Sequence, residues 1–199
     1  MSAVELATPA DAPHLTEIFL AAFSNAFNRR LFPPTAEVRE WFAANVLNGT
    51  GTAPENEIVV KIADPTTGEL AGFAKWVRVA GATGGDRKGQ KLSWPESSDR
   101  ALCDLFFGTM EKDHARIMGG REHYYLDLLG VHPAFQGRGV GAKLLNWGLA
   151  RADREKVEVY LSSSPEGNGL YVKNGFQVLD SFTPFPGYEQ VNMVRPVQN

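Results

Sequence analysis

The stretch "HPAFQGRGVGAKLLNWG", residues 132–148, places three glycines between an apolar run and a helical pattern. Residues 124–131 before it are typical of a strand that ends at Pro133, and residues 139–154 are typical of a helix. A strand that turns directly into a helix aims the free N–H groups of the first helical turn at one point. Glycine lets the backbone approach an anion closely. The stretch therefore predicts a turn that binds phosphate.

Two common classes of phosphate-binding turn do not fit the spacing. A P-loop requires Gly-Lys followed by Ser or Thr, and none of these follows Gly141. A dinucleotide-binding turn requires Gly-x-Gly-x-x-Gly near the first strand and an acidic residue at the end of the next strand. Here the glycines form Gly-x-Gly-x-Gly from Gly137, far along the chain, and the next predicted strand ends in serines at 162–164. Both classes are excluded.

Composition restricts the class of protein further. The chain has 199 residues, 43% of them hydrophobic, which suits one domain over residues 1–199 with a full core. Lys and Arg total 20 against 23 Asp and Glu, and the net charge of −3 argues against a nucleic-acid or membrane-surface partner. No apolar run is long enough to cross a bilayer, and the N-terminus lacks the basic start of a signal peptide. We expect a soluble, cytoplasmic protein.

The single cysteine and the histidines predict neither a disulfide nor a metal site. Cys103 lies on the apolar side of a predicted helix, where we expect a small buried hydrophobe. The four histidines lack the spacing of metal ligands, so no metal is expected.

The remaining patterns predict an α/β fold with antiparallel and parallel strand pairs and helices on both faces of the sheet. Residues 80–99 are rich in Gly, Lys and Ser without periodicity, and they predict a long mobile loop. The other expected elements are a strand at 4–7, a helix with Thr8 as its N-cap, a helix at 36–47, a hairpin over 57–79 with its turn at 64–68, a helix at 100–119, a strand at 157–164, a short helix within 165–176, and strands at 177–182 and 190–197.

Two segments carry a family resemblance. Gln136-x-x-Gly139-x-Gly141 follows "LLGVHP", and "GNGLYVKNGF" comes one helix and one strand later, at residues 167–176. In this order they resemble the two acetyl-CoA-binding segments of the GCN5-related N-acetyltransferase (GNAT) family. The resemblance covers about residues 124–182, and "YYLDLLGVHPAFQGRGVG" resembles a fungal branch of the family. It implies a mixed, mostly antiparallel central sheet with one splayed parallel strand pair and helices on both faces.

The resemblance also implies how acetyl-CoA, as co-substrate, would be held. The pantetheine arm would lie between two splayed strands and pair with main-chain groups, and the pyrophosphate would lie on N–H groups of the glycine turn. Residues 136–156 carry five basic and two acidic side chains, so the local charge is positive despite the overall −3. The implied coenzyme-binding residues are Leu129, Val131, Gln136, Gly137, Arg138, Gly139, Val140, Gly141, Ala142 and Asn168.

Acetyl transfer to an amine requires a group that protonates the departing thiolate and a base that deprotonates the amine. Tyr171 occupies the family's usual position for the acid. A phenol has a pKa of about 10 and a thiol one of about 8.5. Proton transfer from the phenol to the thiolate is therefore unfavourable by roughly 1.5 pKa units. Strict alternation puts Tyr125, Asp127, Leu129 and Val131 on one strand face, which makes Asp127 the preferred base, acting through a water. Two alternatives stay open: Tyr171 is a core tyrosine, and Asp127 is structural, capping a turn or pairing with an arginine across the sheet.

The sequence therefore predicts an acetyl-CoA-dependent N-acetyltransferase that acts on a small-molecule primary amine by direct transfer in a ternary complex. No cysteine is placed as a nucleophile for a covalent acyl-enzyme. The alternatives are a non-catalytic acyl-CoA-binding module, a protein acetyltransferase acting on Lys or N-terminal amines, and an enzyme for longer acyl-CoA. His132 and Glu166 rank below Asp127 as bases. Exposed apolar surface from the last strands, over residues 188–197, makes a homodimer possible.

Overall fold

The structure is a computed structural model that describes residues 3–45, 56–81 and 93–198. Seven strands form one sheet in the order β1-β2-β3-β4-β5-β7-β6. Neighbouring strands are antiparallel except β4 and β5, which are parallel. The strands are β1 (Glu5–Leu6), β2 (Glu57–Ala63), β3 (Leu70–Val79), β4 (His123–Val131), β5 (Glu158–Ser163), β6 (Gln177–Phe185) and β7 (Tyr188–Arg195).

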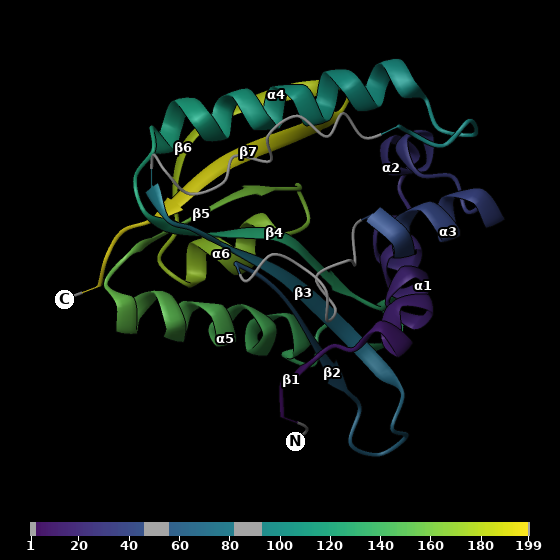
Figure 1. The fold of residues 1–199 in the computed structure, drawn as a ribbon, viewed down its shortest axis with the longest axis horizontal. Helices are drawn as coiled ribbons and strands as arrows, with labels where there is room; N and C mark the ends of the chain where they lie inside the picture. The colour runs from purple at the N-terminus through teal and green to yellow at the C-terminus, as the bar shows by residue number, and fades with distance from the viewer. Residues whose placement is uncertain (1–2, 46–55, 82–92, 199) are drawn as a thin grey trace.

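Helices cover both faces of this sheet (Figure 1). One face, called here the α5 face, is covered by α5 and α6, and the other, the α4 face, by α1 to α4. The expected mixed α/β class is therefore confirmed. No helix in the described ranges is long and apolar enough to span a membrane. The helices are α1 (Ala12–Ala22), α2 (Ala26–Leu31), α3 (Ala36–Asn45), α4 (Arg100–Met118), α5 (Val140–Glu155) and α6 (Asn168–Lys173).

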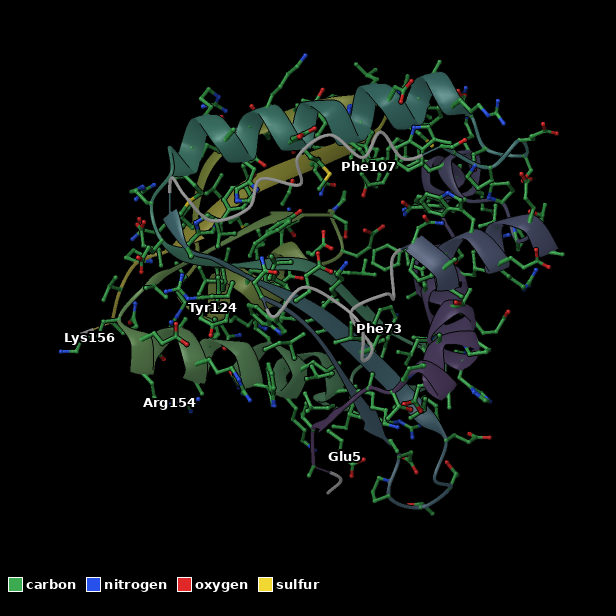
Figure 2. The ribbon with its side chains drawn as sticks, viewed as in Figure 1. Glu5, Phe73, Phe107, Tyr124, Arg154 and Lys156 are labelled. Atoms are coloured by element: carbon green, nitrogen blue, oxygen red, sulfur yellow. The ribbon has the colours of Figure 1, made fainter. Side chains whose placement is uncertain are left out.

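One core lies between the sheet and α5. Leu144, Leu145 and Leu149 recur at helical spacing, so they share one side of α5 and are buried against the sheet. Trp76 of β3 is fully buried in the same core. Tyr124 of β4 extends toward the C-terminal end of α5 (Figure 2), where its hydroxyl donates a 2.5 Å hydrogen bond to Glu155.

The second core, on the α4 face, is largely aromatic. The rings of Phe19 and Phe42 stack with their centroids 4.0 Å apart, and Phe27 meets Phe106 edge to face at 5.1 Å. Phe73 of β3 is fully buried among them (Figure 2). Cys103 is also buried in this core, and desolvation raises the pKa of its thiol to about 12, so it is not a nucleophile at neutral pH.

Gly148 lets α5 approach the sheet. A Cβ at this position would lie 2.2 Å from a ring carbon of Trp76. We expect Gly148→Ala to lower the free energy of unfolding by about 3 kcal/mol, because a fully buried ring has nowhere to move. Gly108→Ala in α4 is the matched control: nothing lies within 4 Å of its Cβ, so better helix propensity should raise stability by about 1 kcal/mol. Urea unfolding measures both, and equal effects would contradict the packing argument.

The N-terminal third contains three helices rather than the two expected before the hairpin. The side chain of Asn25 accepts a 2.9 Å hydrogen bond from the N–H of Asn28 and caps a separate helix, α2, of six residues. A helix this short gives no periodic signal in the sequence. Thr8 caps a 3-10 turn, Pro9–Asp11, which leads into α1. The predicted end of the helix at 36–47 lies outside the described residues.

Residues 93–99 of the predicted loop have no regular secondary structure and are hydrogen-bonded to α3. The indole N–H of Trp41 donates a 2.7 Å hydrogen bond to the carbonyl of Ser93, and Glu37 accepts from the N–H groups of Glu96 and Ser97. These bonds fix the segment on α3. Most of the predicted loop, 82–92, lies outside the described residues. At the C-terminus, β6 runs three residues further than expected, to Phe185, and β7 begins at Tyr188.

Candidate functional site

The site begins where β4 and β5 separate. The two strands pair only where His123–Tyr125 lies opposite Glu158–Tyr160. Beyond this point β4 stays paired to β3 as far as Val131, and β5 to β7 as far as Ser163. In this fully described region, the facing edges of β4 and β5 therefore have no strand partner. Such an edge can accept an extended ligand that pairs as a strand does.

The glycine turn lies at the open end of this gap. Gly137 and Gly139 have φ of +73° and +78°, which L residues with a side chain rarely adopt. The N–H groups of residues 137–142 make no well-formed hydrogen bond within the described part of the chain, and Gly139 offers no side-chain cap. Gln136 ties the turn to β4, because its Nε2 donates a 3.0 Å hydrogen bond to the carbonyl of Val131. Free N–H groups at the N-terminus of a long helix form an anion site.

The turn, the gap and α6 meet at Gly141. A Cβ there would lie 3.5–3.7 Å from side chains of Leu129 and Val131 on β4 and of Leu170 on α6. The first helical turn, with Val140 at its start, thus packs directly against the open edge of β4.

Arg138 points away from the gap. Its guanidinium lies 5.5 Å from the ring centroid of Phe135, and with Lys143 and Asp64 it lines a pocket beside the β2–β3 turn. Hydrogen bonds from two N–H groups lower the pKa of Asp64, and Arg138 adds to this effect.

Two polar groups of α6 have no hydrogen-bond partner in the part of the chain that the structure describes. Asn168 Oδ1 is buried and accepts no hydrogen bond. Tyr171 is 8% exposed with its ring 5.7 Å from that of Phe176, and its hydroxyl makes no hydrogen bond to any described residue. Burial raises the pKa of Tyr171, so its phenol stays protonated at neutral pH. A buried carbonyl without a donor costs about 1–3 kcal/mol, which favours a ligand that donates to Asn168.

Asp127 does not share a strand face with Leu129 and Val131, and that expectation is wrong. The register of β4 against β3 shifts by one residue at Asp127, which is the extra residue of a β-bulge. Leu129 and Val131 pack into the α5-face core, whereas Asp127 meets Lys75 and Tyr125 packs near α4 on the other face. Strict alternation assumes a regular strand and cannot locate a bulge.

Lys75 of β3 lies between two carboxylates. Its Nζ is 2.8 Å from Glu57 and 3.6 Å from Asp127, and its side chain is 4% exposed. Asp127 therefore pairs across the sheet, as one of the open alternatives supposed, although with a lysine rather than an arginine. Lys75 is not among the predicted site residues, and its signal in the sequence is a cation in the middle of the apolar run "LAGFAKWVRV", residues 70–79, with a second cation, Arg78, near its end.

We expect Lys75→Met to lower the free energy of unfolding by about 3 kcal/mol, because it removes the buried cation between the carboxylates of Glu57 and Asp127. The double variant Lys75→Met/Asp127→Asn removes one of these charges and should recover at least about 1 kcal/mol. Urea unfolding of both single variants and the double variant measures the coupling. Additive effects would show that the two side chains do not depend on each other.

The lower-ranked bases are engaged elsewhere. Nδ1 of His132 accepts a 3.3 Å hydrogen bond from the N–H of Ala134 and so caps the turn after β4. Glu166, in the connection between β5 and α6, accepts a 3.2 Å hydrogen bond from Asn25 at the start of α2. Within the described ranges, no three His, Cys, Asp or Glu side chains gather closely enough to hold a metal ion.

Comparisons with known proteins agree with this geometry. Residues 106–178 match the family model of the acetyltransferase (GNAT) domain. A curated acetyltransferase of the fungus Stachybotrys chartarum is 31% identical over 85 residues, which cover 41% of this chain and 36% of that protein. The match thus spans about a third of the relative's length.

Two solved structures are similar over nearly the whole chain. The "histone acetyltransferase HPA2 and related acetyltransferase" of Corynebacterium glutamicum has a TM-score of 0.66 at 25% identity, covering 100% of this chain and 97% of its own. The polyamine N acetyltransferase of Drosophila melanogaster has a TM-score of 0.65 at 16% identity. The match covers 98% of this chain and 99% of that protein's chain. The second likeness concerns the fold alone.

Proposed function

Because this chain belongs to the GNAT acetyltransferase family, we propose that it transfers the acetyl group of acetyl-CoA to the primary amine of a small molecule. One observation carries the proposal. The unpaired edge of β4, the free N–H groups of residues 137–142 and the orphaned carbonyl of Asn168 lie around one gap in the sheet. Together they offer hydrogen bonds to an extended, anionic ligand.

The residues around the gap fit acetyl-CoA group by group. The N–H groups of residues 137–142 would hold the pyrophosphate, since they converge at the start of α5 without acceptors. Main-chain groups of Leu129 and Val131 would pair with the amides of the pantetheine arm, and Asn168 Oδ1 would accept from one of them. When bound, acetyl-CoA supplies an acetyl group activated as a thioester.

The side chains of this chain supply the proton transfers. Tyr171 would give its phenolic proton to the departing sulfur, and burial keeps that proton in place at neutral pH. Asp127 stands on the α4 face, opposite the face that holds Tyr171. An acceptor amine approaching from the α4 face would therefore meet Asp127 as base, through a water, before it meets the thioester.

A small acceptor is supported by the neighbourhood of the gap. Glu166, exposed in the connection between β5 and α6, brings a carboxylate close to the gap, which suits a cationic amine. A structural neighbour over 98% of this chain bears the name polyamine N acetyltransferase.

The proposal predicts acetylation of small amines in the presence of acetyl-CoA. We would incubate the protein with acetyl-CoA and 1,4-diaminobutane, n-pentylamine or a lysine-containing peptide, and follow free CoA thiol and acetylated product by mass spectrometry. The expected result is product from a small amine and none from the peptide. Product from the peptide alone would indicate a protein acetyltransferase, and bound acetyl-CoA without any product would indicate a binding module.

A further inference from the structure

Two buried polar atoms on the α4 face have no hydrogen-bond partner among the described residues. Gln190 of β7 is 4% exposed, and its Oε1 accepts no hydrogen bond. The Oγ of Ser162 on β5 is likewise buried without a partner. Buried polar atoms are nearly always paired in folded proteins, and each exception calls for an explanation. Neither side chain takes part in the acid, base or coenzyme contacts described above.

The two side chains are neighbours on the sheet. Ser162 lies opposite Asn192 in the antiparallel register of β5 and β7, and Gln190 is two residues from Asn192 on the same face. Such diagonal neighbours have Cβ atoms about 7 Å apart, within reach of a glutamine side chain. Asp127 stands on the same face of β4, across the gap from β5. The unpaired groups thus lie on the side of the gap that faces away from Tyr171.

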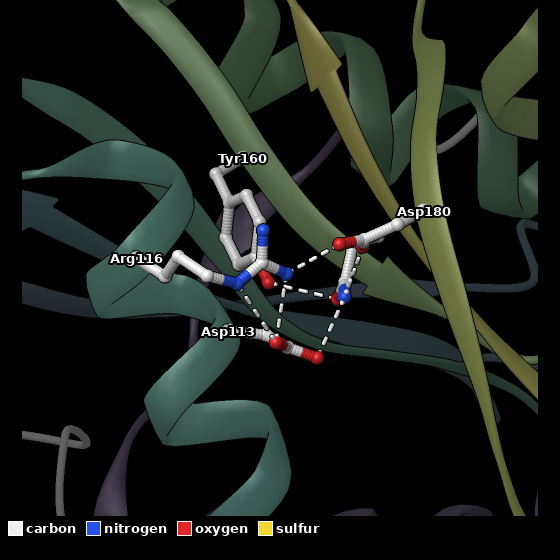
Figure 3. A network of polar contacts seen from close by, with 5 residues as sticks. Asp113, Arg116, Tyr160 and Asp180 are labelled. Atoms are coloured by element: carbon white, nitrogen blue, oxygen red, sulfur yellow. Dashed lines mark hydrogen bonds and ion pairs between the residues drawn. The ribbon is translucent and has the colours of Figure 1, made fainter.

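The next polar residue along β7 is fully paired, which shows that the lack of partners is local. Asn192 Oδ1 accepts a 2.9 Å hydrogen bond from the hydroxyl of Tyr160, and its Nδ2 donates to Asp113 and Asp180. Arg116 links these two carboxylates (Figure 3). The polar groups under α4 are therefore paired with one another. The unpaired atoms of Gln190 and Ser162 lie next to this network, on the side of the open end of the gap.

Aromatic side chains and one exposed acidic residue lie near the orphaned atoms. Tyr188 precedes Gln190 by two residues on the same face, and the ring of Phe27 covers it with centroids 4.1 Å apart. Burial raises the pKa of Tyr188, and the nearby charge of Glu166 adds to that shift. Glu166 is exposed, and its hydrogen bond from Asn25 closes the start of α2 over the connection after β5.

We propose that Gln190 Oε1 and Ser162 Oγ bind a second hydrogen-bond-donating group of the acceptor, distinct from the amine that is acetylated. Both atoms can accept hydrogen bonds, and the exposed carboxylate of Glu166, which lies near Tyr188, favours a positively charged donor. The acceptor class is therefore a diamine, with one ammonium held by this pair while the other amine reacts. This inference rests on the proposed function and names the substrate class of the same site.

Binding to the CoA-saturated protein tests the inference without needing turnover. The probes are 1,4-diaminobutane and n-pentylamine. In n-pentylamine a methyl group replaces one ammonium of the diamine. Calorimetry should show the diamine binding at least about tenfold more tightly to the wild type, the effect of about one good hydrogen bond. Gln190→Leu should remove that preference while leaving n-pentylamine unchanged. Gln177→Leu, the same substitution at an exposed site on β6, should leave both affinities unchanged.

Thermal unfolding separates recognition from a structural role. Gln190→Leu has no hydrogen bond to lose, so its Tm should stay the same or rise, whereas Asn192→Leu breaks the paired network and should lower Tm by several degrees. A fall in Tm for Gln190→Leu equal to that for Asn192→Leu would overturn the inference. The inference would also be overturned if the wild-type protein bound the two amines equally tightly, or bound neither of them. Failure of the proposed function would appear separately, as the absence of any stabilisation by acetyl-CoA.

Discussion

Replacing Tyr171 with phenylalanine should lower kcat for acetyl transfer by about 100-fold or more, the usual contribution of a positioned general acid. The acetyl-CoA dissociation constant should stay nearly unchanged, because the ring that packs against Phe176 is retained. Burial raises the pKa of Tyr171, so the acid stays protonated as pH rises through neutrality. Loss of its proton should therefore cause no fall in wild-type kcat up to about pH 9.

Tyr124→Phe is the control for this change. Its hydroxyl is also mostly buried, but it is paired with Glu155 at the far end of α5. Removing it should lower the free energy of unfolding by about 1–2 kcal/mol and leave kcat unchanged. Pre-steady-state or steady-state assays with a small amine measure kcat for both variants. Wild-type kcat in Tyr171→Phe would show that Tyr171 is a core tyrosine.

Gly139→Val should weaken acetyl-CoA binding by about 30-fold. With φ of +78°, a β-branched residue at this position carries about 2 kcal/mol of backbone strain, which the turn relieves by moving. Because a Cβ here meets nothing within 4 Å, the effect arises from the main chain and its redirected N–H groups rather than from a clash. Calorimetric titration with acetyl-CoA measures the change.

Gly119→Val separates this effect from general strain. Gly119 ends α4 with φ of +55°, and a Cβ there also meets nothing within 4 Å. The variant should lose a similar amount of stability and keep wild-type affinity for acetyl-CoA, because the residue lies outside the turn and the gap. Equal affinities for Gly139→Val and wild type would refute the role of the turn.

The region from β4 to α5 could be predicted because its signals are local. A strand, glycines and a helix follow one another within residues 124–154, and each is stabilised mainly by its own main-chain pattern. The short helix α2 could not be predicted, since it depends on one capping side chain, Asn25. The end of β6 was also missed, because pairing with β7 rather than local pattern sets its length.

The site itself depends on contacts between distant segments. Periodicity alone does not single out Asn168 or Tyr171, and their proposed roles come from the resemblance to a family. The bulge at Asp127 and its ion pair with Lys75 depend on the register between β3 and β4, which no single strand encodes. Gln190 lies in a stretch whose alternation predicts a strand with polar residues on one face. Its burial without a hydrogen-bond partner could not be predicted, because it depends on the helices that pack over that face.

Thermal unfolding in the presence of acetyl-CoA, NAD or ATP tests the central claim most directly. A ligand that binds only the folded state adds about 2.7 kcal/mol at 100 times its Kd, which raises Tm by roughly 5–10 °C for a chain of this size. We expect this rise with acetyl-CoA and not with NAD or ATP. An unchanged Tm at millimolar acetyl-CoA would contradict the assignment of the β4–β5 gap and the glycine turn as its binding site.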